Sequence, residues 1–107
     1  MKKFKIKDST TLNEIEEELK RMKSVNANEF ELSDIIKIAE FLGCTYLGGC
    51  GGTQVRFTHP AIKMYGNFFG VHIIHGRKVE TIKKNDFKTF IFPHLMTIIE
   101  YKKNSEL

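Results

Sequence analysis

Two segments in the second half of the chain alternate between polar and apolar residues, and this pattern limits the possible folds most. Successive side chains of a β-strand point to opposite faces, so each segment has one face for a core and one for solvent. In the segment 53–59 the apolar face carries Val55 and Phe57. In the segment 67–75 it carries Phe69, Val71 and Ile73. The chain is therefore expected to form an antiparallel sheet with one open face.

The elements around these strands follow from local signals. Residues 44–47 form a short strand candidate, and Gly48–Gly52 a flexible turn. Pro60 ends the strand 53–59, because proline has no amide hydrogen for the sheet. A core helix runs from an N-cap at Ser33 to Gly43, a typical C′ residue.

The last helix has two possible N-caps, Asn85 and Asp86. Pro93 lies inside its apolar pattern, and proline breaks or kinks a helix. We therefore expect one helical piece up to Phe92 and a second piece from Pro93 to Lys103.

An N-terminal helix is marked by Thr11 and Glu14, which are spaced as a capping box. Its apolar stripe is narrow and consists of Leu12, Ile15, Leu19 and Met22. We expect a helical appendage or a partner-docking element, followed by a linker at 23–31.

The sequence thus predicts an α+β protein in three parts. Residues 1–31 are the N-terminal helical appendage and linker, residues 32–103 the α+β domain, and residues 104–107 a frayed tail. The domain has the order α-β-β-β-α, with a three-stranded antiparallel sheet whose helices cover one face.

Charge divides the chain unevenly. Residues 1–53 carry 8 Lys/Arg and 9 Asp/Glu, a net −1, whereas residues 54–107 carry 9 and 4, a net +5. A basic half favours a polyanionic partner, although a solvated lysine-rich surface is equally compatible. The sequence contains neither an apolar run that spans a bilayer nor a signal-peptide pattern, so we expect a cytoplasmic protein with reduced cysteines.

Three polar side chains are expected on the open sheet face. Gln54 and Arg56 follow from the alternation of one strand and His72 from that of the other. Arg56 suits a phosphate, and His72 is the best acid or base candidate because histidine titrates near neutral pH. The alternative is an ordinary polar sheet face. His75 is a weaker catalytic candidate beside a basic turn.

Other residues complete the expected site. The predicted RNA contacts are Arg56, Arg77, Lys78, Lys83, Lys84 and Lys88. His59 is expected to be a turn residue at a strand end, and His94 to be structural or exposed. No metal or cofactor is expected, and the glycine-rich turn is no phosphate loop because a strand follows it.

The segments Asp34–Gly43 and Gly51–Pro60 together resemble the HicA-type (YcfA-like) mRNA interferase toxins, in which a helix ending in Leu-Gly leads to a glycine turn and a strand. Val71–Lys78 continues the resemblance, which spans residues 33–101. It implies a fold like that of a double-stranded-RNA-binding domain, a toxin–antitoxin endoribonuclease that cleaves mRNA, and a HicB-like antitoxin as partner. Such an endoribonuclease would need no metal here, because the sequence has no carboxylate cluster to hold one.

The chain departs from the family at one position, because the family's catalytic histidine falls on Gln54. Glutamine cannot act as a general acid or base. Either His72 or His75 replaces it, or the chain binds RNA without cleaving it. Other hypotheses are a non-catalytic protein-interaction module, with a homodimer as one possible assembly, and a thiol enzyme that uses Cys44 or Cys50.

Overall fold

The sheet expected from the alternating segments is present. The computed structural model describes residues 4–49, 54–62, 67–76 and 78–105. In it, β2 (Thr45–Gly49), β3 (Gln54–Thr58) and β4 (Phe68–His72) form an antiparallel sheet in the order β2-β3-β4. All five side chains expected to point inward are buried, namely Val55, Phe57, Phe69, Val71 and Ile73. Alternation therefore predicted the buried face correctly.

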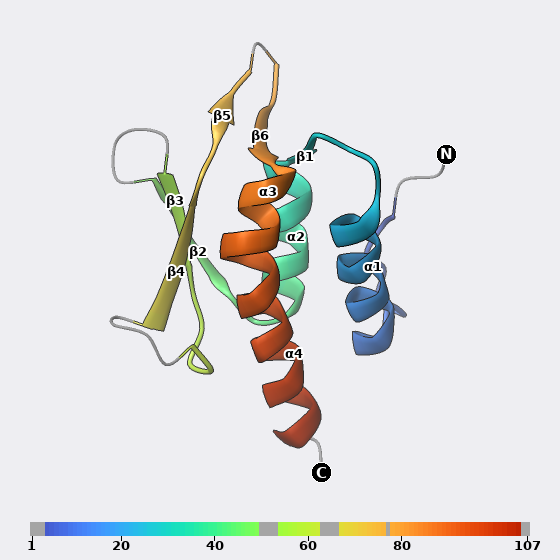
Figure 1. Cartoon of the computed structure of the whole chain (residues 1–107). Coiled ribbons are helices and arrows are strands. Elements are labelled where there is room, and N and C mark those ends of the chain that lie inside the picture. The colour runs from blue at the N-terminus through green and yellow to red at the C-terminus, as the bar shows by residue number, and fades with distance from the viewer. Residues whose placement is uncertain (1–3, 50–53, 63–66, 77, 106–107) are drawn as a thin grey trace.

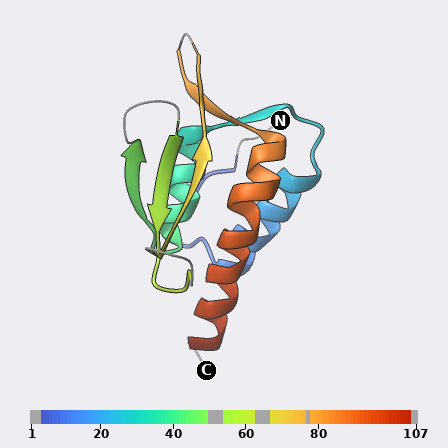
Figure 2. The ribbon, with the colours of Figure 1, turned by 60° about the vertical axis from the view of Figure 1, so that its left-hand side comes forward.

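Helices cover that buried face only. α2 (Leu32–Phe41) and the C-terminal helix (residues 84–105) lie against it, and α1 (Leu12–Ser24) lies beyond them (Figure 1). In Figure 2 the strands stand in front of α2 and beside the C-terminal helix, and no described element crosses their outer face. The fold class is α+β, as expected.

A second small sheet was not expected. β1 (Glu29–Glu31), β6 (Glu80–Lys83) and β5 (Ile74–His75) form it in the order β1-β6-β5. The segment 23–31, expected to be a linker, thus contains a strand, and the expected strand 67–75 is interrupted at Ile73. Strands of two to four residues are too short for alternation to identify them.

The expectation that the N-terminal helix is an appendage was wrong. Ile15 and Leu19 are fully buried and Met22 nearly so, in the same hydrophobic cluster as the sheet residues. Glu16 of α1 also pairs with Lys103 of the C-terminal helix. The stripe is narrow, but all of its central side chains are buried, so α1 belongs to the common core.

Helix ends confirm some local signals and correct others. The Thr11 hydroxyl accepts from the Glu14 amide at 3.2 Å, and the Glu14 carboxylate accepts from the Thr11 amide at 3.0 Å. Gly43 has a φ of 94°, as expected for a glycine after a helix. Ser33, however, is not an N-cap, because α2 begins at Leu32 directly after β1.

The last helix also begins earlier than expected. α3 (Lys84–Asp86) follows β6 without a side-chain cap, so Asn85 and Asp86 lie inside the helix. At both helix starts the last residue of the preceding strand is the N-cap, and its side chain makes no capping hydrogen bond.

Pro93 does not break the last helix. A π-helical segment, η2 (Phe87–Ile91), leads without interruption into α4 (Phe92–Ser105). The Phe92 amide donates to the Phe87 carbonyl, five residues back. The wider π turn lies next to the proline, which lacks an amide hydrogen and crowds the preceding turn of an α-helix.

Candidate nucleic-acid interface

The register between β3 and β4 gathers the three expected side chains on the open face. Gln54 lies directly opposite His72, and Arg56 lies opposite Gly70. Directly opposite residues of an antiparallel pair point to the same face. Gln54 and His72 are exposed, and Arg56 is half-buried. The structure thus places glutamine, arginine and histidine side by side on the uncovered side of the sheet.

Arg56 is held against an aromatic ring on this face. The central guanidinium carbon lies 5.3 Å from the centroid of the Phe68 ring. Such a cation–π contact contributes about 0.5–1 kcal/mol at an exposed site. The Nε atom of Arg56 is buried without a hydrogen-bond partner. Within the described part of the chain no residue accepts a hydrogen bond from Arg56, so its outer nitrogens are available to a ligand.

Two histidines of the expected site differ in their surroundings. His72 ends β4 on the open face, and among the described residues none forms a hydrogen bond or ion pair with its ring. His75 lies in the small second sheet, where its Nδ1 is 2.9 Å from the Glu80 carboxylate. That carboxylate would repel a phosphate. His72 is therefore the better placed of the two for RNA chemistry.

The expected basic contacts are dispersed over the fold. Lys78 lies near the tip of the β5–β6 hairpin, Lys83 ends β6, and Lys88 is exposed on η2. The Lys84 ammonium donates to the Val25 carbonyl, which ties the C-terminal helix to the segment after α1. Arg77 lies outside the described residues. Among the described members of the set, only Arg56 lies on the open sheet face.

The two remaining histidines are structural, in line with expectation. His59 is buried at the end of β3, where its Nδ1 accepts from the Ala61 amide at 3.0 Å. Burial lowers its pKa, although a hydrogen bond to the Leu42 backbone opposes this effect. His94 stacks on Phe69 with ring centroids 4.9 Å apart, and burial lowers its pKa as well.

The surroundings of Cys44 argue against its role as the nucleophile of a thiol enzyme. Cys44 is buried, and burial raises the pKa of its thiol to about 12. A thiol of that pKa is not ionised at neutral pH and is a poor nucleophile. Cys50 lies outside the described residues, as do residues 51–53. Of the expected turn Gly48–Gly52, the first two glycines belong to β2.

The described residues contain no cluster of three His, Cys, Asp or Glu side chains that could hold a metal ion. In these same ranges, no helix combines the length and the apolar character needed to cross a membrane.

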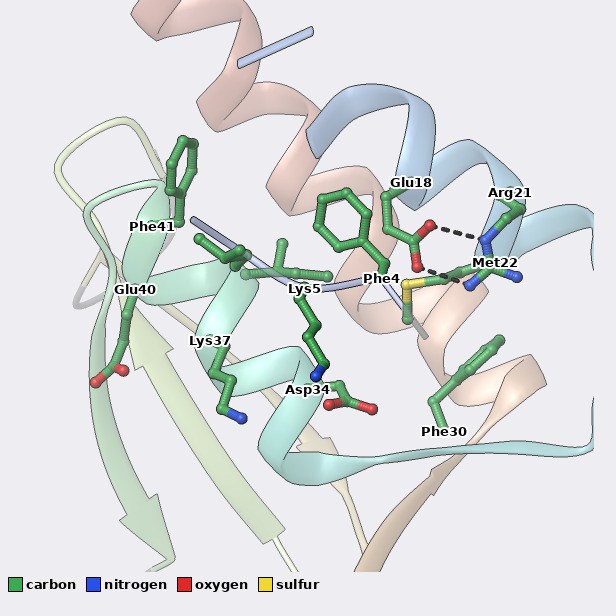
Figure 3. A pocket seen from close by; sticks show the side chains of 12 residues that line it. Phe4, Lys5, Glu18, Arg21, Met22, Phe30, Asp34, Lys37, Glu40 and Phe41 are labelled. Carbon is green, nitrogen blue, oxygen red and sulfur yellow. Dashed lines mark hydrogen bonds and ion pairs between the residues drawn. The ribbon is translucent and has the colours of Figure 1, made fainter. Parts of the chain in front are cut away.

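A groove lies away from the open sheet face, between the N-terminal segment, α1 and α2 (Figure 3). It encloses about 920 Å³. Its apolar walls are Phe4, Ile6, Met22, Phe30, Ile38 and Phe41. Its charged residues are Lys5, Arg21 and Lys37 together with Glu18, Asp34 and Glu40. Because these charges balance, the groove does not favour a polyanion.

The open face contains two residues whose importance the sequence did not reveal. Phe68 lies under the Arg56 guanidinium, and Gly70 lies between Phe68 and His72 on the same strand. Alternation from His72 places both residues on this face, but it does not reveal their contacts with Arg56. No protein-family model, curated protein or solved structure matches the chain significantly.

Proposed function

We propose that the chain binds RNA on the open face of the β2-β3-β4 sheet. The observation that supports this most strongly is the grouping of Gln54, Arg56 and His72 on the one sheet face that no described element covers. The outer nitrogens of Arg56 can hydrogen-bond a phosphate, and the Gln54 amide can hydrogen-bond a ribose or a base. The net charge of +4 attracts a polyanion to the molecule.

The resemblance to HicA-type toxins extends this proposal to catalysis. In a metal-independent endoribonuclease, His72 takes the proton of a ribose 2′-hydroxyl, whose oxygen bonds to the adjacent phosphorus and displaces the 5′-oxygen of the next nucleotide. The displaced oxygen takes a proton from water, and Gln54 hydrogen-bonds near the scissile phosphate. The chain then acts on mRNA in the cytoplasm, and a HicB-like antitoxin neutralises it. As part of the same proposal, the fold is similar to that of a double-stranded-RNA-binding domain.

RNA binding is tested by fluorescence anisotropy with a labelled single-stranded RNA at several salt concentrations. The RNA-binding constant falls with salt, and each phosphate contact on single-stranded nucleic acid makes the slope of log K against log salt steeper by about 0.7. Arg56→Ala should make the slope less steep by about this amount and weaken binding. Lys37→Ala removes an exposed charge on α2 beside the groove, and it serves as the matched control. Equal losses for the two variants would show that binding is not centred on the sheet face.

Cleavage is tested separately on the same RNA. We expect the wild type to cleave it and His72→Ala to bind it without cleavage. Equal cleavage by both proteins removes His72 from the mechanism. Binding without cleavage by the wild type leaves a binding protein and rejects the nuclease.

A protein-interaction module is the second candidate, and the groove favours it. The apolar walls and balanced charges of the groove suit an amphipathic segment of a protein partner, which under this proposal is a HicB-like antitoxin. Phe41→Asp should abolish complex formation in size-exclusion chromatography and leave RNA binding unchanged. The same chromatography of the chain alone tests whether it forms a homodimer.

A further inference from the structure

Gly70 lies in the middle of the open face, and its lack of a side chain makes room for its neighbours. A Cβ atom there would lie 3.1 Å from the Val55 carbonyl oxygen. It would also lie 3.3 Å from both the Arg56 Cγ and the Gln54 Nε2. Gly70 is not among the glycines with a positive φ, so the backbone conformation does not require glycine. The Val55 carbonyl and the side chains of Arg56 and Gln54 occupy the space that a side chain at position 70 would need.

The space over Gly70 determines where the Arg56 guanidinium lies. The aliphatic stem of Arg56 passes close to Gly70, and the guanidinium then lies over the Phe68 ring, 5.3 Å from its centroid. This packing buries Nε, which has no hydrogen-bond partner. An arginine can bind an oxyanion side-on, through Nε and one outer nitrogen, or end-on, through both outer nitrogens. Burial of Nε leaves the end-on mode.

We propose that Gly70 and Phe68 are positioning residues that hold Arg56 for end-on, bidentate binding of one RNA phosphodiester. This inference rests on the proposed function. A phosphodiester has two non-bridging oxygens, which match the two outer nitrogens of the guanidinium. An arginine already packed in place loses less side-chain entropy on binding than a freely rotating one. Lysine has no such fork, so Arg56→Lys should bind RNA nearly as weakly as Arg56→Ala.

The positioning is measured without RNA by ¹⁵N NMR of the arginine side chains. The Arg21 Nε donates to Glu18 at 2.7 Å and provides a rigid comparator. In the wild type the Arg56 Nε–H should be as ordered as that of Arg21 and protected from solvent exchange. Gly70→Ala and Phe68→Leu should each mobilise it. Thr45→Ala, exposed on β2 and separated from Phe68 by β3, should leave it unchanged. An Arg56 Nε–H that exchanges like that of free arginine in the wild type overturns the positioning.

The RNA-binding consequence is measured by a double-mutant cycle. Gly70→Ala should weaken binding about tenfold in the wild-type background, within the range of coupled neighbours. In the Arg56→Ala background, Gly70→Ala should change the RNA affinity less than about twofold, which is the deviation from additivity that independent sites show. The same fold loss in both backgrounds shows that Gly70 does not act through Arg56, and this overturns the inference.

The two proposals fail in different ways. A folded wild type that binds no RNA rejects the proposed function and the phosphodiester as ligand, whereas the NMR comparison still decides the positioning. If Gly70→Ala unfolds the chain, Phe68→Leu provides the same cycle, because it removes the ring and leaves the backbone contact of Gly70 intact.

Discussion

The cross-strand pairing of Gln54 with His72 predicts a gain of function. The Cβ atoms of directly opposite residues in an antiparallel pair lie about 4.5–5.5 Å apart. Gln54→His therefore places two imidazoles side by side over one RNA linkage. One imidazole can then act as the base and the other as the acid. The wild type has only one such group at this position.

The expected size of the effect follows from that missing group. A positioned general acid or base contributes about 10²–10⁴-fold to a rate. We expect Gln54→His to raise the RNA cleavage rate by this factor and to give a bell-shaped pH profile. The assay is the initial rate on a short RNA carrying a fluorophore and a quencher, with the DNA version as an uncleavable substrate.

Thr58→His is the matched control for this prediction. Residue 58 lies on the same strand and the same face, but it is opposite Phe68 and not His72. It should not accelerate cleavage. Equal acceleration by both variants would refute the reasoning, as would a Gln54→His protein that binds RNA normally and cleaves no faster than the wild type.

Three further predictions concern stability and reactivity. Leu19→Ala should lower the free energy of unfolding by about 2–5 kcal/mol, because Leu19 is fully buried. A urea midpoint equal to that of the wild type would show that α1 does not stabilise the core. Burial lowers the pKa of His59 and of His94, and the charge of Lys102 lowers that of His59 further. Just below the ordinary histidine pKa of about 6.5, the unfolded chain therefore binds more protons than the folded chain. The free energy of unfolding should therefore be highest above about pH 6.5 and should decrease as the pH falls towards the lowered pKa values of the two histidines. Equal urea midpoints at about pH 7.5 and 5.5 would contradict this. Cys44 should react with a thiol reagent only after unfolding, since burial raises its pKa to about 12, and mass spectrometry that detects its alkylation in the native protein would contradict this.

The sheet and its open face could be predicted because the signal is local. Each strand residue takes its face from its immediate neighbours, so Phe57 and Val71 had to be buried if the strands formed at all. The same rule placed Arg56 and His72 outward. The register that sets Gln54 opposite His72 depends on the connection between the strands, and alternation alone does not determine it.

The remaining features depend on contacts between distant parts of the chain. β1 pairs with β6, with Glu29 opposite Lys83, and neither strand is long enough to show a periodic pattern. The Lys84 ammonium binds the Val25 carbonyl, 59 residues away in sequence. A lysine in such a structural contact has the same local sequence signal as a lysine available to RNA. The sequence therefore could not show which of the expected basic residues have structural roles and which can bind RNA.

The most direct test of RNA binding on the open sheet face is a titration of the ¹⁵N-labelled chain with single-stranded RNA, followed by amide chemical shifts. The amides of β3 and β4 should shift or broaden in a saturable way, and those of α1, beyond the helix layer, should not. Shifts confined to α1 and α2, or none at RNA concentrations that saturate comparable proteins, would contradict the proposed site.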